Sequence, residues 1–288
     1  MEYGRTDLAV EAAAAFGPEP PPGVGVEQLE EEGVRVTRMQ VRTPQAARRL
    51  GRPPGRYITV ELPAFPQPVD PAGAACRLVA RELAALLPRE GTVLVAGLGN
   101  RQITPDALGP RTCRQILATR HLAGPLARQV GLEGLRPVAA LAPGVLGQTG
   151  MEAWEVLTAV VERIRPAAVI AVDALAAREL SRLGSTVQLC DTGISPGSGV
   201  LNARRELSPQ TLGVPVAAVG IPTVVDGASL ARALTGGECP ANAPAAGMMV
   251  TPRQIDEIIQ RGADCLAQAI NQALQPTLTP QELQFLAG

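Results

Sequence analysis

The 288-residue sequence predicts an α/β fold, in which a mostly parallel sheet is covered by helices on both faces. The first observation is a series of short, fully apolar runs, typical of strands that are buried on both sides. The second is that segments with the apolar spacing of amphipathic helices separate these runs. The apolar runs are TVLVAGLG (92–99), PVAALAP (137–143), AAVIAVD (167–173), TVQLCD (186–191) and PVAAVGIP (215–222). The segments with helical spacing are residues 106–122, 150–164 and 174–183.

Two alternating segments near the start predict a small N-terminal β extension. VRVTRMQV (34–41) and RYITVEL (56–62) alternate like half-buried strands, so we expect them to pair, with the polar residues 48–55 as a loop. Before them, GPEPPPGVG (17–25) is expected to be a linker behind a short N-terminal arm. After them, AACRLVARELAALL (74–87) has the spacing of a helix and ends at a proline.

The core α/β layer is expected to span residues 90–275 and to close with a helix over residues 251–274. Thr251-Pro252 has the N-cap and proline signature of a helix start. Residues 236–247 (GGECPANAPAAG) are expected to form an irregular surface loop. No internal repeat divides the chain, which favours a single domain.

Charge and composition exclude several classes of function. The 26 Lys and Arg residues balance 27 Asp and Glu, so the chain lacks the basic surface of a nucleic-acid binder. One histidine cannot supply the ligand clusters of most zinc enzymes, and we expect no metal or other cofactor. No apolar stretch approaches the roughly 18–20 residues of a membrane helix, and the N-terminus does not resemble a secretory signal. The sequence therefore predicts a soluble, cytoplasmic protein that does not bind a membrane.

The cysteines are odd in number, and no two lie at C-x-x-C spacing. We therefore expect buried, reduced thiols in a cytosolic protein. The five residues are Cys76, Cys113, Cys190, Cys239 and Cys265.

Carboxylates follow the predicted strands at the edge where α/β proteins bind ligands. Asp173 ends an otherwise apolar strand, and Asp106 follows the turn that leaves strand 92–99. Two carboxyl groups at one edge can share a proton, so that one activates water while the other donates a proton. The ordinary alternatives are that Asp106 lies in the first turn of a helix and that Asp173 caps the next helix. Pattern alone leaves both interpretations open.

Four other candidates are weaker. Gly97-Leu98-Gly99-Asn100 begins like a dinucleotide fingerprint, but Gln102 stands where the third glycine is needed, so a tight turn is favoured. Gly193-Ile194-Ser195-Pro196-Gly197 matches a serine-hydrolase pattern, but Pro196 has no N–H for an oxyanion hole.

The remaining two candidates also lack their partners. The only histidine, His121, precedes Ser195 and is expected on the last turn of a helix. Asp191-Thr192-Gly193 occurs once, whereas pepsin-like enzymes need two such loops in an all-β fold.

Long blocks of the sequence resemble the germination proteases of spore-forming bacteria, over nearly the whole chain. The blocks are RTDLAVEA (5–12), GLGNRQITPDALGPRTCRQILATRHL (97–122), RPVAALAPGVLGQTGMEAWEVL (136–157), VIAVDALAARELSRL (169–183), DTGISPGSGVLNARR (191–205), LGVPVAAVGIPTVVD (212–226) and MMVTPRQIDEII (248–259). The resemblance implies an endopeptidase that degrades small acid-soluble DNA-binding spore proteins in the forespore or spore core, with a fold similar to hydrogenase-maturation peptidases. It also implies a homotetramer. Asp106 and Asp173 stand at the positions of the family's catalytic aspartates, so the resemblance implies that these two residues are catalytic.

The same resemblance implies a precursor that removes its own N-terminus. Its substrates are cut after an acidic residue and before an apolar-Ala-x-Glu sequence, and Asp7-Leu8-Ala9-Val10-Glu11 fits this pattern. We therefore expect cleavage between Asp7 and Leu8, with residues 1–7 as the propeptide and 8–288 as the peptidase domain. Ser195 departs from the family, in which a histidine is expected at this position.

Two alternatives to an aspartate-dependent peptidase stay open. In the first, Asp106 and Asp173, with or without Asp191, hold a divalent cation for a metallopeptidase. In the second, the chain is a non-enzymatic module that binds spore proteins. Asn100, Asp191 and Ser195 are possible supporting residues of the site. Arg204 and Arg205 are candidates for binding the acidic residue before the cut, although ordinary solvated arginines fit this pattern too.

Overall fold

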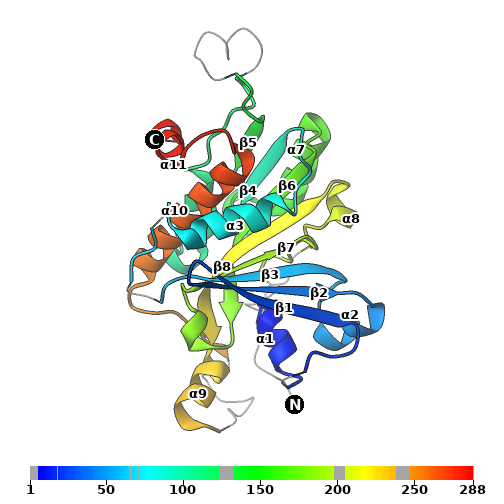
Figure 1. The fold of residues 1–288 in the computed structure, drawn as a ribbon, viewed down its shortest axis with the longest axis vertical. Coiled ribbons are helices and arrows are strands. Elements are labelled where there is room, and N and C mark those ends of the chain that lie inside the picture. Colours follow the sequence, from blue (N-terminus) through cyan, green and yellow to red (C-terminus); the bar gives the residue numbers. More distant parts are fainter. Residues whose placement is uncertain are drawn as a thin grey trace.

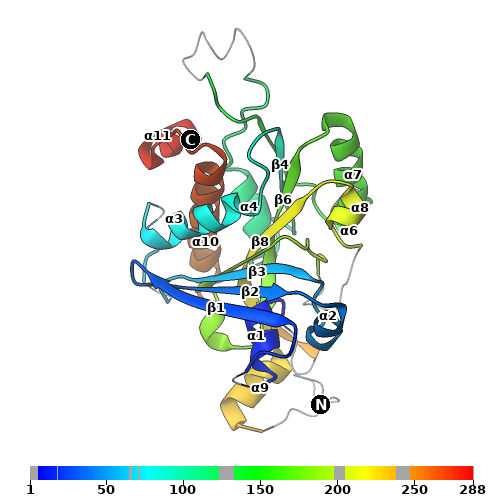
Figure 2. The ribbon, with the colours of Figure 1, turned by 45° about the vertical axis from the view of Figure 1, so that its right-hand side comes forward.

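A twisted β-sheet runs through the protein and carries helices on both faces (Figures 1 and 2). The structure is a computed structural model that describes residues 6–17, 19–64, 67–70, 72–122, 133–197, 205–237 and 247–287. Over these residues, nine strands form one mixed sheet in the order β1-β2-β3-β7-β8-β6-β4-β5, with β9 paired to β8. The strands are β1 (Val24–Glu31), β2 (Val34–Val41), β3 (Gly55–Glu61), β4 (Val93–Gly97), β5 (Val138–Leu141), β6 (Ala168–Ala177), β7 (Thr186–Cys190), β8 (Val216–Asp226) and β9 (Met249–Val250).

The sheet has a parallel half and an antiparallel half. Strands β5, β4, β6 and β8 are parallel to their neighbours, as expected for buried apolar runs. Strand β7 is antiparallel to both β8 and β3, and β1 to β3 continue the sheet in antiparallel register. The predicted α/β class is confirmed, and the predicted N-terminal extension is an edge of the main sheet.

Alternating side chains of the parallel strands enter two different cores. Val93 and Val95 of β4 face a core built with α3 and α10, whereas Leu94 and Ala96 face a core that includes Leu157 of α7. Figure 2 shows α3 and α10 on one side of the sheet and α7 and α8 on the other. The helices, with the two 3₁₀ turns, are α1 (Ala9–Ala14), α2 (Pro44–Leu50), α3 (Ala74–Ala84), η1 (Thr104–Asp106), α4 (Leu108–Cys113), α6 (Leu146–Thr149), α7 (Ala153–Ile164), η2 (Leu180–Arg182), α8 (Pro209–Leu212), α9 (Gly227–Thr235), α10 (Ile255–Leu274) and α11 (Pro280–Ala287).

Strand β6 does not end at Asp173, and the helix predicted over residues 174–183 is wrong. Instead, β6 continues to Ala177, where it pairs with Val225 of β8. The extension is stable because Leu175 and Ala177 are buried against Val225 on one side of the strand. Asp173 therefore lies inside a strand and caps no helix.

The helix predicted over residues 106–122 is also mostly wrong, because α4 ends at Cys113. Beyond α4, the backbone forms hydrogen bonds with the side chain of Asn271 on α10. The Asn271 amide donates to the Gln115 carbonyl and accepts from the Leu117 N–H, both at 2.9 Å. These tertiary hydrogen bonds replace the helical ones. His121 is therefore exposed in a turn and does not lie on a helix end.

Three further boundaries differ from the sequence prediction. The expected loop 48–55 begins inside α2, whose cap residue Thr43 accepts the Ala46 N–H. The expected linker 17–25 is shortened because β1 starts at Val24. Helix α10 starts at Ile255, since β9 pairs with β8 just before it. Most of the expected surface loop, residues 238–246, lies outside the described residues.

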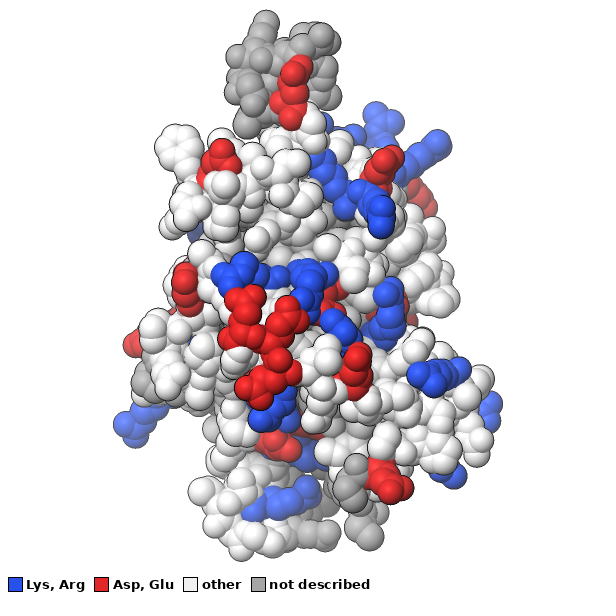
Figure 3. All heavy atoms as spheres, viewed as in Figure 1, with Lys and Arg blue, Asp and Glu red and all other residues white. Residues whose placement is uncertain are grey.

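The acidic residues at the end of β1 form ion pairs with arginines of helix α3. Glu31 pairs with Arg81, and Glu32, just after the strand, pairs with Arg77. Figure 3 shows acidic and basic side chains next to one another over this face of the molecule. Because the partners come from distant parts of the chain, the acidic run gives no local signal for a strand, and β1 was not predicted.

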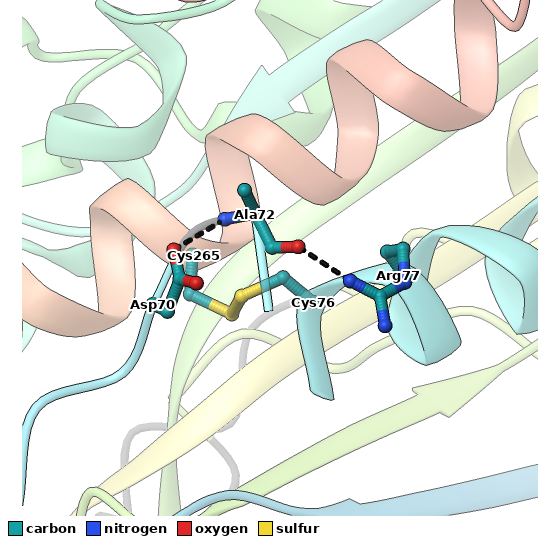
Figure 4. Close-up of a disulfide and its surroundings, with 5 residues drawn as sticks. All are labelled: Asp70, Ala72, Cys76, Arg77 and Cys265. Carbon is teal, nitrogen blue, oxygen red and sulfur yellow. Dashed lines mark hydrogen bonds between the residues drawn. A yellow bond between two sulfur atoms is a disulfide. The ribbon is translucent and has the colours of Figure 1, made fainter. Parts of the chain in front are cut away.

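Cys76 of α3 and Cys265 of α10 form a disulfide across the same face, with their Cα atoms 5.7 Å apart (Figure 4). The prediction that all thiols are reduced is therefore wrong for this pair, which is separated by 189 residues in sequence. Cys113 and Cys190 are buried free thiols, as expected, and Cys239 lies outside the described residues. Among the described helices, none has the length and apolar character that crossing a membrane requires.

Candidate active site

Asp173 lies in the middle of β6, opposite Gly220 of β8, and is only 5% exposed. Burial raises the pKa of Asp173 well above its ordinary value, and the negative charge of Asp106 raises it further. The Ala174 N–H, which donates to Asp173 Oδ1 at 2.9 Å, opposes this shift, and the charge of Asp7 adds to it. Asp173 therefore holds its proton at a higher pH than an exposed aspartate.

Asp106 is the last residue of η1, on the turn that follows β4. Its Oδ2 accepts the Asn100 backbone N–H at 2.7 Å, an interaction that suits an ionised carboxylate. The Asn100 side chain is itself held, because its Oδ1 accepts from the Gln102 N–H and from the side-chain amide of Gln148. The Asn100 loop thus fixes the position of the Asp106 carboxylate.

The turn between β4 and η1 requires Gly99. Its φ of 107° lies in the left-handed region, and a Cβ there would lie 2.1 Å from the Asp106 carbonyl oxygen. Gly109 allows a second close approach, because a Cβ there would lie 2.2 Å from the Leu98 carbonyl and 2.4 Å from that of Val172. The glycines therefore bring η1 and α4 directly against the end of β4 and the middle of β6.

Asp106 and Asp173 line one cavity of about 340 Å³ beside the ends of the parallel strands. Asp7 of the N-terminal segment lines the same cavity. The other lining residues include Leu98, Gly99, Ile103, Pro105, Gly144, Val145, Leu175, Ile194, Ser195, Thr223, Met249 and Thr251. Three carboxyl groups on a largely apolar wall are well suited to moving protons to and from a bound substrate.

A second cavity of about 330 Å³ adjoins the first and shares four wall residues with it. The shared residues are Asp7, Leu175, Ile194 and Ser195. Arg52, a cation, and Tyr57 line this second cavity. Burial raises the pKa of Tyr57 to about 12. The two cavities therefore meet at these four residues, of which Asp7 is one.

Specific contacts hold the N-terminal segment beside these two cavities. The Asp7 N–H donates to the Ala176 carbonyl, and the Ala176 N–H donates to Asp7 Oδ2, both at 2.8 Å. Arg52 donates to the carbonyl of Thr6, and Leu8 is fully buried. The bond between Asp7 and Leu8, where cleavage is expected, therefore lies beside the cavity that contains Asp106 and Asp173.

The structure does not bring Asp191 to the other two aspartates. Asp191 instead forms a salt bridge with Arg56, with Nε and Oδ2 2.7 Å apart, and it lines neither cavity. Over the described residues, no three His, Cys, Asp or Glu side chains are arranged to hold a metal ion. The alternative in which Asp191 completes a cation site with Asp106 and Asp173 is therefore wrong for this structure.

Of the two arginines expected to bind substrate, the structure describes Arg205, which lines neither cavity. Arg205 places its guanidinium carbon 4.0 Å from the centre of the Trp154 ring, a cation–π contact, and Arg204 lies outside the described residues. Sequence reasoning missed Arg52, which lies between α2 and β3. No motif marks this arginine, and only the tertiary fold brings it to the N-terminal segment.

Fold and site together define an α/β protein in which two carboxyl groups, those of Asp106 and Asp173, line one cavity. A sequence model of germination protease matches residues 13–234. The germination protease of Caldanaerobacter subterraneus subsp. tengcongensis is 39% identical, over 98% of this chain and 97% of the relative. That of Clostridium perfringens is 37% identical over 97% of both chains, and that of Priestia megaterium is 43% identical over 78% of this chain and 64% of the relative.

The chain belongs to the germination protease family, and it is therefore an endopeptidase with a role in spore germination. Among solved structures, the [NiFe] hydrogenase maturation protease HycI from Thermococcus kodakarensis matches 66% of this chain and 98% of its own. Its sequence identity is 17% and its TM-score is 0.37, which is too low to support an inference about activity.

Proposed function

We propose that this endopeptidase initiates the degradation of small acid-soluble DNA-binding spore proteins, cutting after an acidic residue with Asp106 and Asp173 as its catalytic pair. The observation that carries the proposal is that Asp7, Asp106 and Asp173 line one cavity. The two carboxyl groups have different surroundings in this cavity, so they take different roles. Asp106 activates the attacking water as general base, and Asp173, whose pKa is raised by burial and by Asp106, donates a proton to the leaving amine.

The proposal includes self-processing between Asp7 and Leu8, which leaves residues 1–7 as a propeptide and residues 8–288 as the mature domain. The support is the position of Asp7 on the cavity wall and its contact with β6 at Ala176. Ser195 lies on the wall of both cavities, where its hydroxyl can hold water or a peptide carbonyl in place of the histidine expected in the family.

Homotetramer formation and residence in the forespore or spore core complete the proposal. Sedimentation velocity measures the first directly, and a monomer at micromolar concentration would contradict it. Fluorescence of a tagged chain in sporulating cells measures the second.

Cleavage of a purified spore DNA-coat protein by the wild type, Asp106→Asn and Asp173→Asn, with and without a chelator, tests the mechanism. We expect the wild type to cut with or without the chelator and each variant to lose at least about a hundredfold in rate. Loss of wild-type cleavage on chelation would favour a metallopeptidase. Binding without cleavage by the wild type would favour a binding module.

A further inference from the structure

Thr223 is an extra residue in β8, at a point where this strand pairs with β6. Leu175 of β6 pairs with Pro222. The next residue of β6, Ala176, pairs with Val224, so Thr223 has no partner residue in β6. A bulge of this kind interrupts the regular alternation of side chains along a strand and is typical of the borders of active sites.

The hydroxyl group of Thr223 is buried and has no hydrogen-bond partner among the described residues. The residue is only 1% exposed, so solvent at the surface does not replace the missing partner. Its backbone carbonyl, in contrast, accepts a hydrogen bond of 2.8 Å from the hydroxyl of Thr251. A buried polar group without a partner destabilises a fold, and therefore its presence calls for an explanation.

The position of Thr223 supplies that explanation, because the residue lines the cavity of Asp106 and Asp173. Thr112 of α4 also has a buried hydroxyl without a partner among the described residues, but it lines neither this cavity nor the adjoining one. Over the described part of the chain, Thr223 alone combines such a hydroxyl with a place on the wall of the carboxylate cavity.

Thr223 also lies next to the part of β6 that holds the bond expected to be cut. Ala176 exchanges two hydrogen bonds with Asp7, whose carbonyl belongs to the Asp7–Leu8 bond. Thr223 directly precedes Val224, the residue of β8 that pairs with Ala176. Asp7 and Thr223 thus adjoin the same residue of β6 on the wall of one cavity.

We propose that Thr223 is a further catalytic residue, whose hydroxyl donates a hydrogen bond to the oxyanion that forms on the carbonyl before the cut. The inference rests on the proposed function, because it takes the Asp7–Leu8 bond as the one positioned for hydrolysis by Asp106 and Asp173. A hydroxyl without a partner in the resting protein suits this role, since only interactions that are stronger in the transition state accelerate the reaction.

The proton and electron transfers balance with this assignment. The oxygen of water bonds to the carbonyl carbon, one proton of the water passes to Asp106, and the π electrons of the carbonyl move onto its oxygen. When the C–N bond breaks, the carbonyl forms again and the proton of Asp173 passes to the leaving nitrogen. Thr223 keeps its own proton throughout, and transfer of a proton from Asp106 to Asp173 restores the starting state.

Thr223→Val and Thr223→Ser test the inference by separating activity from stability. Valine has the shape of threonine without the hydroxyl, so kcat on a purified spore DNA-coat protein should fall about a hundredfold or more while KM hardly changes. The urea midpoint of this variant should equal or exceed that of the wild type, because no hydroxyl is left unpaired. Serine keeps the hydroxyl but removes a buried methyl group, so Thr223→Ser should unfold at lower urea and keep most of its kcat.

Thr112→Val is the matched control, since it removes the other fully buried, unpartnered threonine hydroxyl from a position away from both cavities. It should resemble Thr223→Val in its urea midpoint and keep the kcat of the wild type. The inference is overturned if Thr223→Val keeps its kcat, if both valine variants lose kcat equally, or if kcat falls with stability in Thr223→Ser as well.

A binding experiment separates this inference from the proposed function, because it needs no cleavage. The probes are two peptides of residues 6–13 (TDLAVEAA), in which the Asp–Leu amide is replaced by a phosphinate, tetrahedral and anionic, or by a ketomethylene group, which keeps a planar carbonyl. Calorimetry should show that Thr223→Val binds the phosphinate at least about tenfold more weakly than the wild type and the ketomethylene peptide almost as well.

The ratio between the two peptides decides the inference. Equal effects of Thr223→Val on both peptides, or no binding of either by the wild type, would overturn it. Cleavage that survives in Asp106→Asn and Asp173→Asn, or a wild type that cuts nothing, would defeat the proposed function, and the phosphinate-to-ketomethylene ratio would still show whether Thr223 contacts the oxyanion.

Discussion

Asp173 shows at the scale of one residue how the fold can prepare a carboxyl group for proton transfer. Burial and the charge of Asp106 raise the pKa of Asp173 well above its ordinary value. The folded state therefore binds this proton more tightly than the unfolded chain does. The stability that comes from the protonated group is fully present below the unfolded pKa of about 4 and is lost as the pH rises through the raised folded pKa.

Asp173→Asn is accordingly expected to abolish proteolysis while making the fold less sensitive to pH. The free energy of unfolding of the variant minus that of the wild type should grow as the pH rises from about 4 towards 8. Urea unfolding of both proteins across this range measures the difference. Asp256→Asn, at an exposed position in the first turn of α10, is the control and should give a much flatter difference. A pH-independent difference for Asp173→Asn would show that its pKa is not raised.

Gly99→Ala tests how closely the turn after β4 fixes Asp106. An added Cβ would lie 2.1 Å from the Asp106 carbonyl oxygen at a φ of 107°, so the turn has to shift. We expect a loss of about 2–4 kcal/mol in stability and a strong loss of cleavage. Gly33→Ala is the control, since its φ is 74° with open space around it, and it should cost about 1 kcal/mol with cleavage retained. Equal effects of the two substitutions on cleavage would contradict this account.

At the scale of elements, the apolar runs predicted the parallel strands well, because a strand that is buried on both faces consists almost entirely of apolar residues. Residues 174–183 were misread as a helix because Ala and Leu suit both structures, and pairing of Ala177 with Val225 decides in favour of a strand. Asp106 and Asp173 could be selected from their positions after apolar runs. Arg52 and the contacts of Glu11 could not, because they depend on packing between elements far apart in sequence.

The disulfide between α3 and α10 is the covalent link between two elements on one face of the sheet. We expect Cys76→Ser to lower the free energy of unfolding under oxidising conditions by about 2–4 kcal/mol. Reductant should lower the stability of the wild type and leave that of Cys76→Ser unchanged. Peptide mapping without reductant identifies the linked pair directly. A wild type that does not respond to reductant would contradict a structural role for this disulfide.

At the scale of the whole molecule, the N-terminal segment connects elements from both halves of the sheet. It contacts β6 through Asp7, β7 through Gln188 and the turn before η2 through Glu11. These elements are brought together only when the mixed sheet is complete. The segment therefore reaches the carboxylate cavity only in the folded chain, which ties the proposed self-processing to correct folding.

This arrangement predicts where and how the chain processes itself. The Asp7–Leu8 bond lies beside the cavity of its own chain, so purified wild-type protein should acquire a new N-terminus at Leu8, as read by N-terminal sequencing or intact mass. Asp106→Asn and Asp173→Asn should keep residues 1–7, and the exposed Asp256→Asn should be processed normally. Because the contacts that hold the segment are intramolecular, the rate should not change on dilution. A rate proportional to protein concentration would indicate cleavage between chains, and an N-terminus other than Leu8 would show that the contacts of Asp7 do not position the bond that is cut.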